Sequence, residues 1–213
     1  MNCKREDLLV YAITDRSWLN GESLYSQVEK SLKGGATFMQ LREKNLDDET
    51  FYQEAVELKA LCARYHVPFV INDNVDIALR MDADGVHVGQ SDMEAGDVRS
   101  KLGPDKIIGV SAHNAEEARA AQAAGADYLG VGAAFVTGTK TDAKPISRET
   151  IRAVTAAVDI PVVAIGGISH DNVLELAGCG LDGVAVVSAL FAQPDVKTAA
   201  EEMLRLSRQI SRP

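Results

Sequence analysis

The chain has 213 residues and a mass of 22.8 kDa, which suits one domain with a substantial hydrophobic core. Its 22 Lys and Arg residues against 31 Asp and Glu residues give a formal net charge of −9, which argues against general binding to nucleic acids or membrane surfaces. Cys3, Cys62 and Cys179 show no disulfide or metal-ligand spacing, and no apolar run approaches the roughly 18 residues of a membrane span, so we expect a reduced, cytoplasmic location.

Segments that predict strands and segments that predict helices alternate along the chain. Strands rich in Val, Ile and Gly are predicted at Leu8–Asp15 and Thr37–Lys44, twice within Pro68–Asp92, and at Ile107–His113, Tyr128–Phe135, Pro161–Gly167 and Gly183–Leu190. Helices are predicted at Glu22–Lys33, from Asp47 or Asp48 to about Tyr65, inside Pro68–Asp92, and at Glu94–Leu102, Asn114–Ala124, Ser147–Val158, Asn172–Ala177 and Lys197–Ile210.

This alternation predicts an α/β fold, a single-domain (β/α)8 TIM barrel over residues 1–213. Continuous apolar strands are typical of a parallel sheet that is covered on both faces. A doubly wound open sheet is the competing architecture, but it usually has five or six strands. In a barrel the functional site lies at the C-terminal ends of the strands, so the residues that follow each strand carry the prediction of function.

The stretch Pro68–Asp92 places a carboxylate after each of two neighbouring strands, because Asp73 follows Asn72 and Asp92 lies just beyond the next strand. Neighbouring parallel strands lie about 5 Å apart. The two carboxylates could therefore bind one hard cation such as Mg²⁺, which prefers oxygen ligands. Helix capping by each Asp is the alternative and, taken alone, the favoured explanation.

The second strand ends in polar residues that alternate with apolar ones. Alternation puts Gln40, Arg42 and Lys44 on one face and Met39 and Leu41 on the other. If the apolar pair packs under the helices, the polar side chains point into the barrel mouth, where cations are costly without an anion to meet. The acidic chain would hold an anionic ligand with such a local cluster of positive groups.

The two cations, and the serine that ends the fifth strand, also have structural explanations. Arg42 or Lys44 could pair with Glu43 or Asp15, which we rate slightly below a ligand site. Ser111, at the end of the fifth strand, could donate to an anion or equally well cap a helix.

Three further segments predict a phosphate site. The loop Thr137-Gly138-Thr139-Lys140 follows the sixth strand with hydroxyls, a glycine and a cation, which together suit phosphate, although this segment alone could be a solvated loop. Gly166-Gly167 ends the seventh strand and Val187-Ser188 ends the eighth, which matches the usual phosphate position of these barrels.

The histidines suggest no catalytic dyad. His66 and His170 are predicted at the surface, His87 as a core histidine with satisfied hydrogen bonds, and His113 stays open. Without a nucleophile and base, the inventory suits departure of pyrophosphate or phosphate, where catalysis is mostly positioning and charge neutralisation.

With these residues assembled, the chain resembles the thiamine-phosphate synthase family along nearly its whole length. The similarity lies in the ordered segments YAITDR, QLREK, INDNVDIAL, DGVHVGQSD, IGVSAHN, ADYLGVGAAF, TGTKTDA, VVAIGGI and VAVVSAL. The family joins 4-amino-2-methyl-5-hydroxymethylpyrimidine diphosphate to 4-methyl-5-(2-hydroxyethyl)thiazole phosphate. The products are thiamine phosphate and pyrophosphate.

The resemblance implies a role for each matching position. The pyrimidine diphosphate would be bound by Gln40, Leu41, Arg42, Glu43, Lys44 and Asn72, and its diphosphate also by Ser111 and Lys140. The thiazole phosphate would be bound by Thr137, Gly138, Thr139, Gly167, Val187 and Ser188. Mg²⁺ would be bound by Asp73 and Asp92. The catalytic group would be Arg42, Lys44, Ser111 and Lys140.

The pattern departs from the family at Val136, where the resemblance leads us to expect proline. The alternatives are a thiazole tautomerase-like isomerase and a catalytically silent barrel that binds thiamine intermediates. The isomerase would not need the carboxylates and the full set of cations found here. Substituted cationic or carboxylate positions would have favoured the silent barrel, and none is seen. The sequence leaves open the oligomeric state, the choice between Mg²⁺ and Mn²⁺, and closure of the 136–144 loop as a lid.

Overall fold

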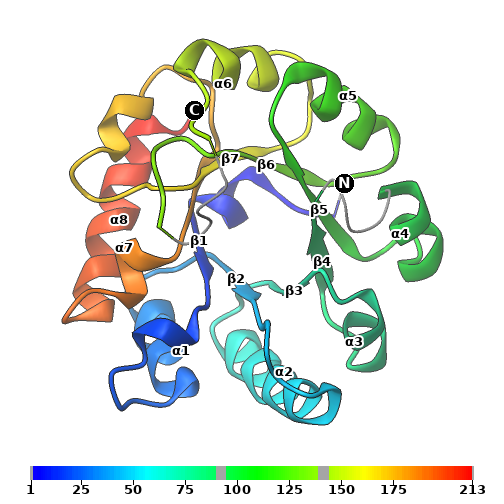
Figure 1. Cartoon of the computed structure of the whole chain (residues 1–213), viewed down its shortest axis with the longest axis vertical. Helices are drawn as coiled ribbons and strands as arrows, with labels where there is room; N and C mark the ends of the chain where they lie inside the picture. Colours follow the sequence, from blue (N-terminus) through cyan, green and yellow to red (C-terminus); the bar gives the residue numbers. More distant parts are fainter. Residues whose placement is uncertain (1, 90–94, 139–143, 213) are drawn as a thin grey trace.

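The structure, a computed structural model, describes residues 2–89, 95–138 and 144–212. Its strands form a closed barrel in the order β1 to β8, and the helices surround them (Figure 1). Every strand runs parallel to both neighbours, and Val10 of β1 pairs with Val184 of β8 to close the ring. The predicted (β/α)8 barrel is confirmed.

The strands are short and almost entirely buried. They are β1 Val10–Ile13, β2 Phe38–Leu41, β3 Phe69–Asn72, β4 Gly85–Val88, β5 Ile107–Ala112, β6 Tyr128–Gly132, β7 Val162–Ile165 and β8 Gly183–Val186. The α-helices are α1 Leu24–Lys33, α2 Asp48–Arg64, α3 Val75–Arg80, α4 Ala95–Leu102, α5 Ala115–Ala123, α6 Arg148–Thr155, α7 Ser188–Phe191 and α8 Val196–Ile210. The described residues also include three 3₁₀-helices: η1 Arg5–Leu8, η2 Arg16–Trp18 and η3 Val173–Leu176.

Polar side chains begin most of the α-helices at the end of the barrel where the strands finish. The side chains that accept a hydrogen bond from a first-turn backbone N–H are Ser23, Asp47, Asn74, Asn114, Ser147 and Asp195. Such caps satisfy N–H groups that lack a partner within the helix. Asp47, one of the two residues predicted to start α2, is its cap.

The hydrophobic core has two parts, one on each face of the barrel wall. The outer part lies between strands and helices and includes Met39 and Leu41. The inner part fills the barrel with Tyr11, Phe38 and Tyr128 among others. Alternation along each strand separates the two sets, as predicted for β2.

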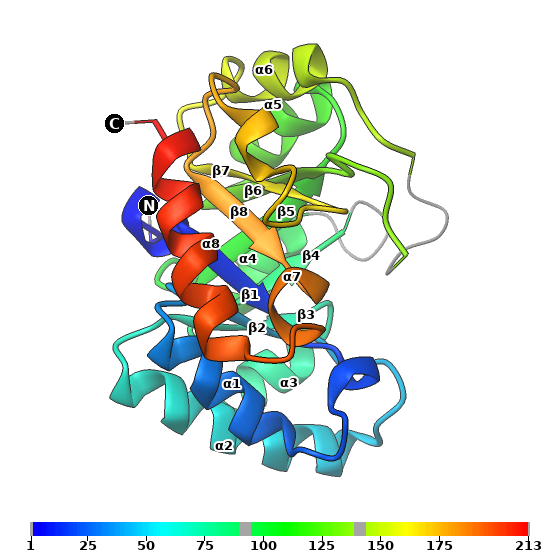
Figure 2. The same ribbon diagram turned by 90° about the vertical axis from the view of Figure 1, so that its left-hand side faces the viewer.

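The barrel differs from the sequence prediction mainly at strand ends. Leu8 belongs to η1, which closes the bottom of the barrel, so the first strand is shorter than predicted. The prediction of one strand over Gly183–Leu190 is wrong, because β8 ends at Val186 and α7 begins at Ser188 (Figure 2). His170 is half-buried rather than a surface residue, since its Nε2 lies 2.9 Å from the Ala199 carbonyl oxygen.

At the N-terminal end of the barrel, which we call the base, four side chains tie neighbouring strands together. Each precedes an even-numbered strand and accepts a hydrogen bond from a backbone N–H near the start of the strand before it. These four base bonds are Val10 N–Thr37 Oγ1 at 2.9 Å, Phe69 N–Asp84 Oδ2 at 2.8 Å, Ile108 N–Asp127 Oδ2 at 3.0 Å and Val162 N–Asp182 Oδ2 at 2.8 Å.

Arginines neutralise two of these aspartates. Arg99 lies 2.6 Å from Asp127, and Arg212 donates two hydrogen bonds of 2.7 Å to the fully buried carboxylate of Asp182. Arg5 adds a contact of 3.3 Å to Asp182. Buried carboxylates need such partners, so the base is a closed set of charges. Within the described ranges, no helix is both long and apolar enough to cross a membrane.

Candidate active site

The C-terminal end of the barrel, which we call the mouth, gathers the polar residues that follow the strands. Lys44, after β2, places its Nζ 3.4 Å from Asp73 Oδ2, after β3. Asn72 donates to the same carboxylate oxygen at 2.6 Å. Three residues to which the sequence assigned diphosphate or metal binding therefore lie together.

Asp73 is not a helix cap. The cap of α3 is Asn74, whose side chain accepts from the Ile77 N–H at 2.9 Å, so the capping explanation for Asp73 is wrong. Asp73 itself has a φ of 61°, a left-handed conformation that is uncommon outside glycine. Such backbone conformations cluster at functional sites, where the surrounding structure holds them.

Arg42 shows that the ion-pair alternative is partly correct. Its guanidinium lies 3.7 Å from Asp15 Oδ2, and its backbone N–H donates to Thr14 Oγ1 at 2.9 Å. The pair is long for a charge-assisted hydrogen bond, which is usually below 3 Å. The backbone of Arg42 is therefore held in place by a hydrogen bond, whereas its side chain makes only a long contact with the carboxylate of Asp15.

Two other residues of this segment direct their side chains elsewhere. Leu41 is fully buried in the outer core. Glu43 lies 2.8 Å from the Arg16 guanidinium, which also contacts Glu54. Burial raises the pKa of Glu43 above its ordinary value, although Arg16 opposes the shift.

Four of the predicted phosphate residues line a common cavity of about 250 Å³. Val187 is not in its lining and packs against the inner core. Thr137, Gly138, Gly167 and Ser188 come from the ends of three strand–loop segments that are far apart in the sequence. Gly167 has a φ of 66°, and a Cβ there would lie 2.3 Å from the Val136 carbonyl oxygen. Only glycine permits this close approach of two loops. Asp92, Thr139 and Lys140 lie outside the described residues.

A chain of hydrogen-bonded side chains crosses the barrel interior below the mouth. Gln40 Nε2 contacts the Tyr11 hydroxyl, which lies 2.8 Å from the Tyr128 hydroxyl. Tyr128 in turn lies 3.0 Å from His87 Nδ1, and His87 Nε2 lies 3.1 Å from Ser111 Oγ. We call these five residues the polar chain. The prediction of a satisfied core histidine is confirmed for His87.

The sequence reading missed Tyr11 and Tyr128. The sequence did contain a signal for them, namely an aromatic residue with a hydroxyl at a core position. Each tyrosine lies at an inward position of its strand, two or more residues before the C-terminal end of the strand, where branched aliphatic residues usually fill a barrel. His113, left open, instead pairs with Glu117 at 2.9 Å on the surface.

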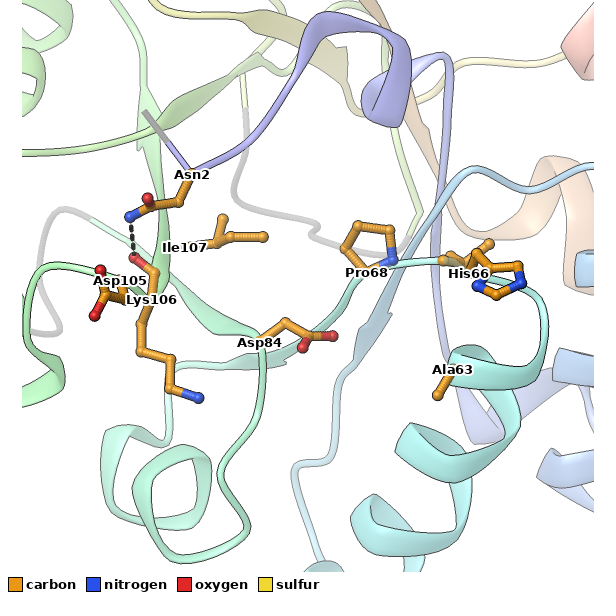
Figure 3. A pocket seen from close by; sticks show the side chains of 9 residues that line it. Asn2, Ala63, His66, Pro68, Asp84, Asp105, Lys106 and Ile107 are labelled. Carbon is orange, nitrogen blue, oxygen red and sulfur yellow. Dashed lines mark hydrogen bonds between the residues drawn. The ribbon is translucent and has the colours of Figure 1, made fainter.

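A second cavity, of about 430 Å³, opens at the base between the starts of β3 and β5 (Figure 3). Its lining includes His66, Asp84 and Lys106 and none of the predicted site residues. Asp84 is already used in a base bond. The base cavity therefore plays no part in the site predicted from the sequence.

Comparison with known proteins decides the family. Residues 10–190 match the family model described as thiamine monophosphate synthase. The chain belongs to this family. It is 49% identical over 200 residues to a thiamine-phosphate synthase of Ruminiclostridium cellulolyticum, covering 94% of this chain and 95% of that protein. It is 50% identical over 197 residues to the thiamine-phosphate synthase of Alkaliphilus oremlandii, covering 92% and 94%.

A solved structure of a thiamine phosphate pyrophosphorylase from Pyrococcus furiosus is also similar, with a TM-score of 0.89 and 40% identity over 97% of this chain and 98% of that one. The resemblance predicted from the sequence is confirmed. The comparisons support the synthase reading, a transferase of thiamine biosynthesis, and not the isomerase or silent-binder alternatives.

The residues of the mouth fit a magnesium ion held jointly with a substrate. Among the described residues, no three or more His, Cys, Asp or Glu side chains gather as a metal site. Mg²⁺ is commonly bound by one or two carboxylates together with substrate phosphates. Asp73, at the mouth and 34% exposed, supplies such a hard oxygen donor.

Proposed function

We propose that the mouth of this thiamine monophosphate synthase family member binds the pyrimidine diphosphate beside Lys44, Asn72 and Asp73 and the thiazole phosphate in the 250 Å³ cavity. The observation that supports the proposal is that two groups of polar residues suited to anions lie at one end of the barrel. One contains a cation beside a carboxylate, and the other contains hydroxyls and the close-packed Gly167.

In the proposed reaction, the bond between the pyrimidine methylene carbon and the diphosphate oxygen breaks, and the leaving group takes the electron pair. The thiazole nitrogen then supplies its lone pair to form the new C–N bond. That nitrogen carries no proton, so no general base is needed. The aminopyrimidine is electron-rich and can carry the positive charge, which favours a dissociative path.

The roles of the side chains follow from charge. Arg42, Lys44 and Lys140 stabilise the negative charge that grows on the departing diphosphate. Ser111 donates a hydrogen bond to it. When bound, Mg²⁺ held by Asp73 and Asp92 would neutralise further charge on the same oxygens. Thr137, Gly138, Thr139, Gly167, Val187 and Ser188 hold the thiazole phosphate and so fix the attacking nitrogen.

The first test is a coupled assay with both phosphorylated substrates, with and without Mg²⁺, that follows thiamine phosphate and pyrophosphate. We expect metal-dependent formation of both products. Asp73→Asn should remove most of the activity, whereas the matched change Asp76→Asn, on the exposed side of α3, should not. Metal-independent turnover would overturn the magnesium proposal. Absence of product with retained thiazole phosphate binding would overturn the synthase proposal.

Lys140→Ala separates chemistry from binding. We expect turnover to fall by about 100-fold, because one donor to a developing anion has that typical effect, while binding of the pyrimidine diphosphate changes much less. An unchanged rate would remove Lys140 from the chemistry. The cytoplasmic location stays a prediction from the sequence.

A further inference from the structure

Three consecutive residues after β2 differ in how closely their charges are paired. Glu43 lies between Arg42 and Lys44, the two cations proposed above to stabilise the departing diphosphate. These cations make ion pairs of 3.7 and 3.4 Å, whereas both carboxylate oxygens of Glu43 lie within 2.9 Å of Arg16 Nε. The side chain of Glu43 is 3% exposed, against 23% for Arg42 and 53% for Lys44. The middle residue is therefore the most firmly held of the three.

Arg16 connects Glu43 to two other parts of the molecule. Arg16 lies in η2, after β1, and its Nη2 lies 2.5 and 2.6 Å from the two carboxylate oxygens of Glu54. Glu54 belongs to α2, which covers the outside of the barrel (Figure 1). A guanidinium is planar and has several N–H donors, so it can contact two carboxylates at once. We call Arg16, Glu43 and Glu54 the anchor.

The register of the sheet explains why Arg16 meets Glu43. Ile13 lies beside Gln40 at the end of the ladder between β1 and β2. Thr14 continues the ladder, since its N–H donates to the Gln40 carbonyl oxygen at 3.0 Å. Three residues beyond the last ladder pair, the same register places Arg16 beside Glu43. The anchor therefore extends the pairing of the two strands into the mouth by means of side chains.

The direction of the Glu43 side chain bears on its two neighbours. In an extended segment successive side chains point to opposite sides, so a side chain directed outward, toward η2 and α2, turns the residues before and after it to the other side. Lys44 accordingly meets Asp73, which follows β3 at the mouth.

The anchor is a costly way to fill this space. Glu43 Oε1 is buried and makes no hydrogen bond among the described residues, so this oxygen depends on its ion-pair contact with Arg16. A well-packed apolar side chain is often at least as stable as a buried ion pair, whereas an ion pair can fix one arrangement of the chain. The presence of a buried carboxylate between two cations therefore suggests a role in their placement.

We propose that Arg16 and Glu43 are positioning residues, and that Glu54 completes their anchor. The anchor holds the backbone between Arg42 and Lys44, so that both cations face the diphosphate before it binds. The side chain of Glu43 itself does not contact the pyrimidine diphosphate. This inference rests on the proposed function of the two cations.

The kinetic test is Glu43→Gln, which keeps the shape of the side chain and removes its charge. We expect kcat to fall by about tenfold, because displaced cations stabilise the leaving group less well, while KM for the thiazole phosphate changes by less than about twofold. Asp127→Asn is the matched control, since it removes a buried carboxylate charge that Arg99 meets at 2.6 Å at the base. It should lower stability and leave kcat unchanged. A similar fall in kcat in both variants would indicate general destabilisation and overturn the proposal.

A double-mutant cycle with Lys44→Ala separates positioning from packing. Only Arg42 is then left to be displaced, so Glu43→Gln should lower kcat by less than about threefold in that background. An equal loss in both backgrounds would overturn the proposal.

Arg16→Lys is a milder change on the exposed side of the anchor. It keeps the charge but cannot contact both carboxylates in the same way, and it should lower kcat by about threefold. An unchanged kcat in both Arg16→Lys and Glu43→Gln would overturn the proposal.

Hydrogen exchange in the substrate-free protein tests the anchor without turnover. In Glu43→Gln we expect the backbone amides of residues 42–46 to exchange about tenfold faster, whereas in Asp127→Asn they should exchange as in the wild type. Unchanged exchange of these amides in Glu43→Gln would overturn the positioning role. Failure of the synthase proposal would appear separately, as absence of product with the wild-type protein.

Discussion

The charged side chains at the two ends of the barrel differ in how closely they are paired and how deeply they are buried. At the base, the Asp182 side chain is fully buried and is matched by a backbone N–H and two arginines at 2.7 to 3.3 Å. At the mouth, Arg16 pairs closely with Glu43 at 2.8 Å, but the cations predicted to bind the diphosphate are paired more loosely: Lys44 is 53% exposed and meets Asp73 at 3.4 Å, while Arg42 meets Asp15 at 3.7 Å. Closed charge sets support the fold, whereas loosely paired charges can exchange their partners for a ligand. Stability and chemistry are therefore separated along the barrel axis.

Asp182→Ala should have the largest effect on stability. It leaves the Arg212 guanidinium and the Val162 N–H without their buried acceptor, and we expect a loss of about 3–5 kcal/mol in the free energy of unfolding. Urea unfolding followed by circular dichroism measures it. Asp105→Ala, an exposed aspartate on the same end of the barrel, is the control and should change little. Equal stability of both variants would contradict the role given to the base.

Lys44→Ala tests the opposite end. Because its ion pair is exposed, we expect the free energy of unfolding to change by less than about 0.5 kcal/mol. Loss of a cation at the diphosphate should lower kcat by about 100-fold. Lys30→Ala, which removes an exposed pair with Glu22, should leave both quantities nearly unchanged. A large loss of stability in Lys44→Ala would contradict the separation of stability at the base from chemistry at the mouth.

Thr37→Val probes the one base bond made without a charge. The substitution keeps the shape but leaves the Val10 N–H without its acceptor, which should cost about 1–3 kcal/mol. Chemical denaturation measures the loss, and kcat of the folded enzyme should stay the same. A fall in kcat would indicate that the base also shapes the mouth.

Asp195→Asn should have the smallest effect of these substitutions. It tests a carboxylate near the mouth that caps a helix, whereas Asp73 does not cap one. Hydrogen bonds from the Thr198 backbone and side chain lower the pKa of Asp195 in the folded protein. Its charge therefore contributes stability above an unfolded pKa of about 4, and this contribution is lost as pH falls through the lower folded value. Asparagine still caps the helix, so the variant should lose less stability between about pH 6 and pH 3. An identical pH dependence of the denaturation midpoint would contradict this.

Much of the fold could be predicted from the sequence because strand and helix periods alternate so regularly. The ends of the strands and helices could not be predicted in this way. In the sequence, Ser188 looks like part of an apolar strand, but in the barrel β8 ends at Val186 and α7 begins at Ser188. The local pattern of Leu8 likewise favoured a strand, but packing against the bottom of the barrel places it in η1.

The part of the candidate site that could be predicted consists of the residues that come directly after the strands. To predict that Asn72, Asp73 and Lys44 lie together, it was enough to know that the strands are parallel and in which order they follow one another. The polar chain could not be predicted, because Tyr11 and Tyr128 are 117 residues apart and the contact of Tyr128 with His87 depends on Gly109 having no side chain. Long-range contacts inside a barrel carry no local pattern in the sequence.

The base bonds also bear on how the chain folds. Each joins residues only 15 to 27 positions apart, within one strand–helix–strand unit. Short loops close with little loss of entropy, whereas pairing β1 with β8 must bring together residues from the two ends of the barrel. We therefore expect the amides of Phe69, Ile108 and Val162 to gain protection early in pulse-labelling hydrogen exchange, and the β1–β8 seam to be protected last. Early protection of that seam would instead mean that the ring closes before its units are complete.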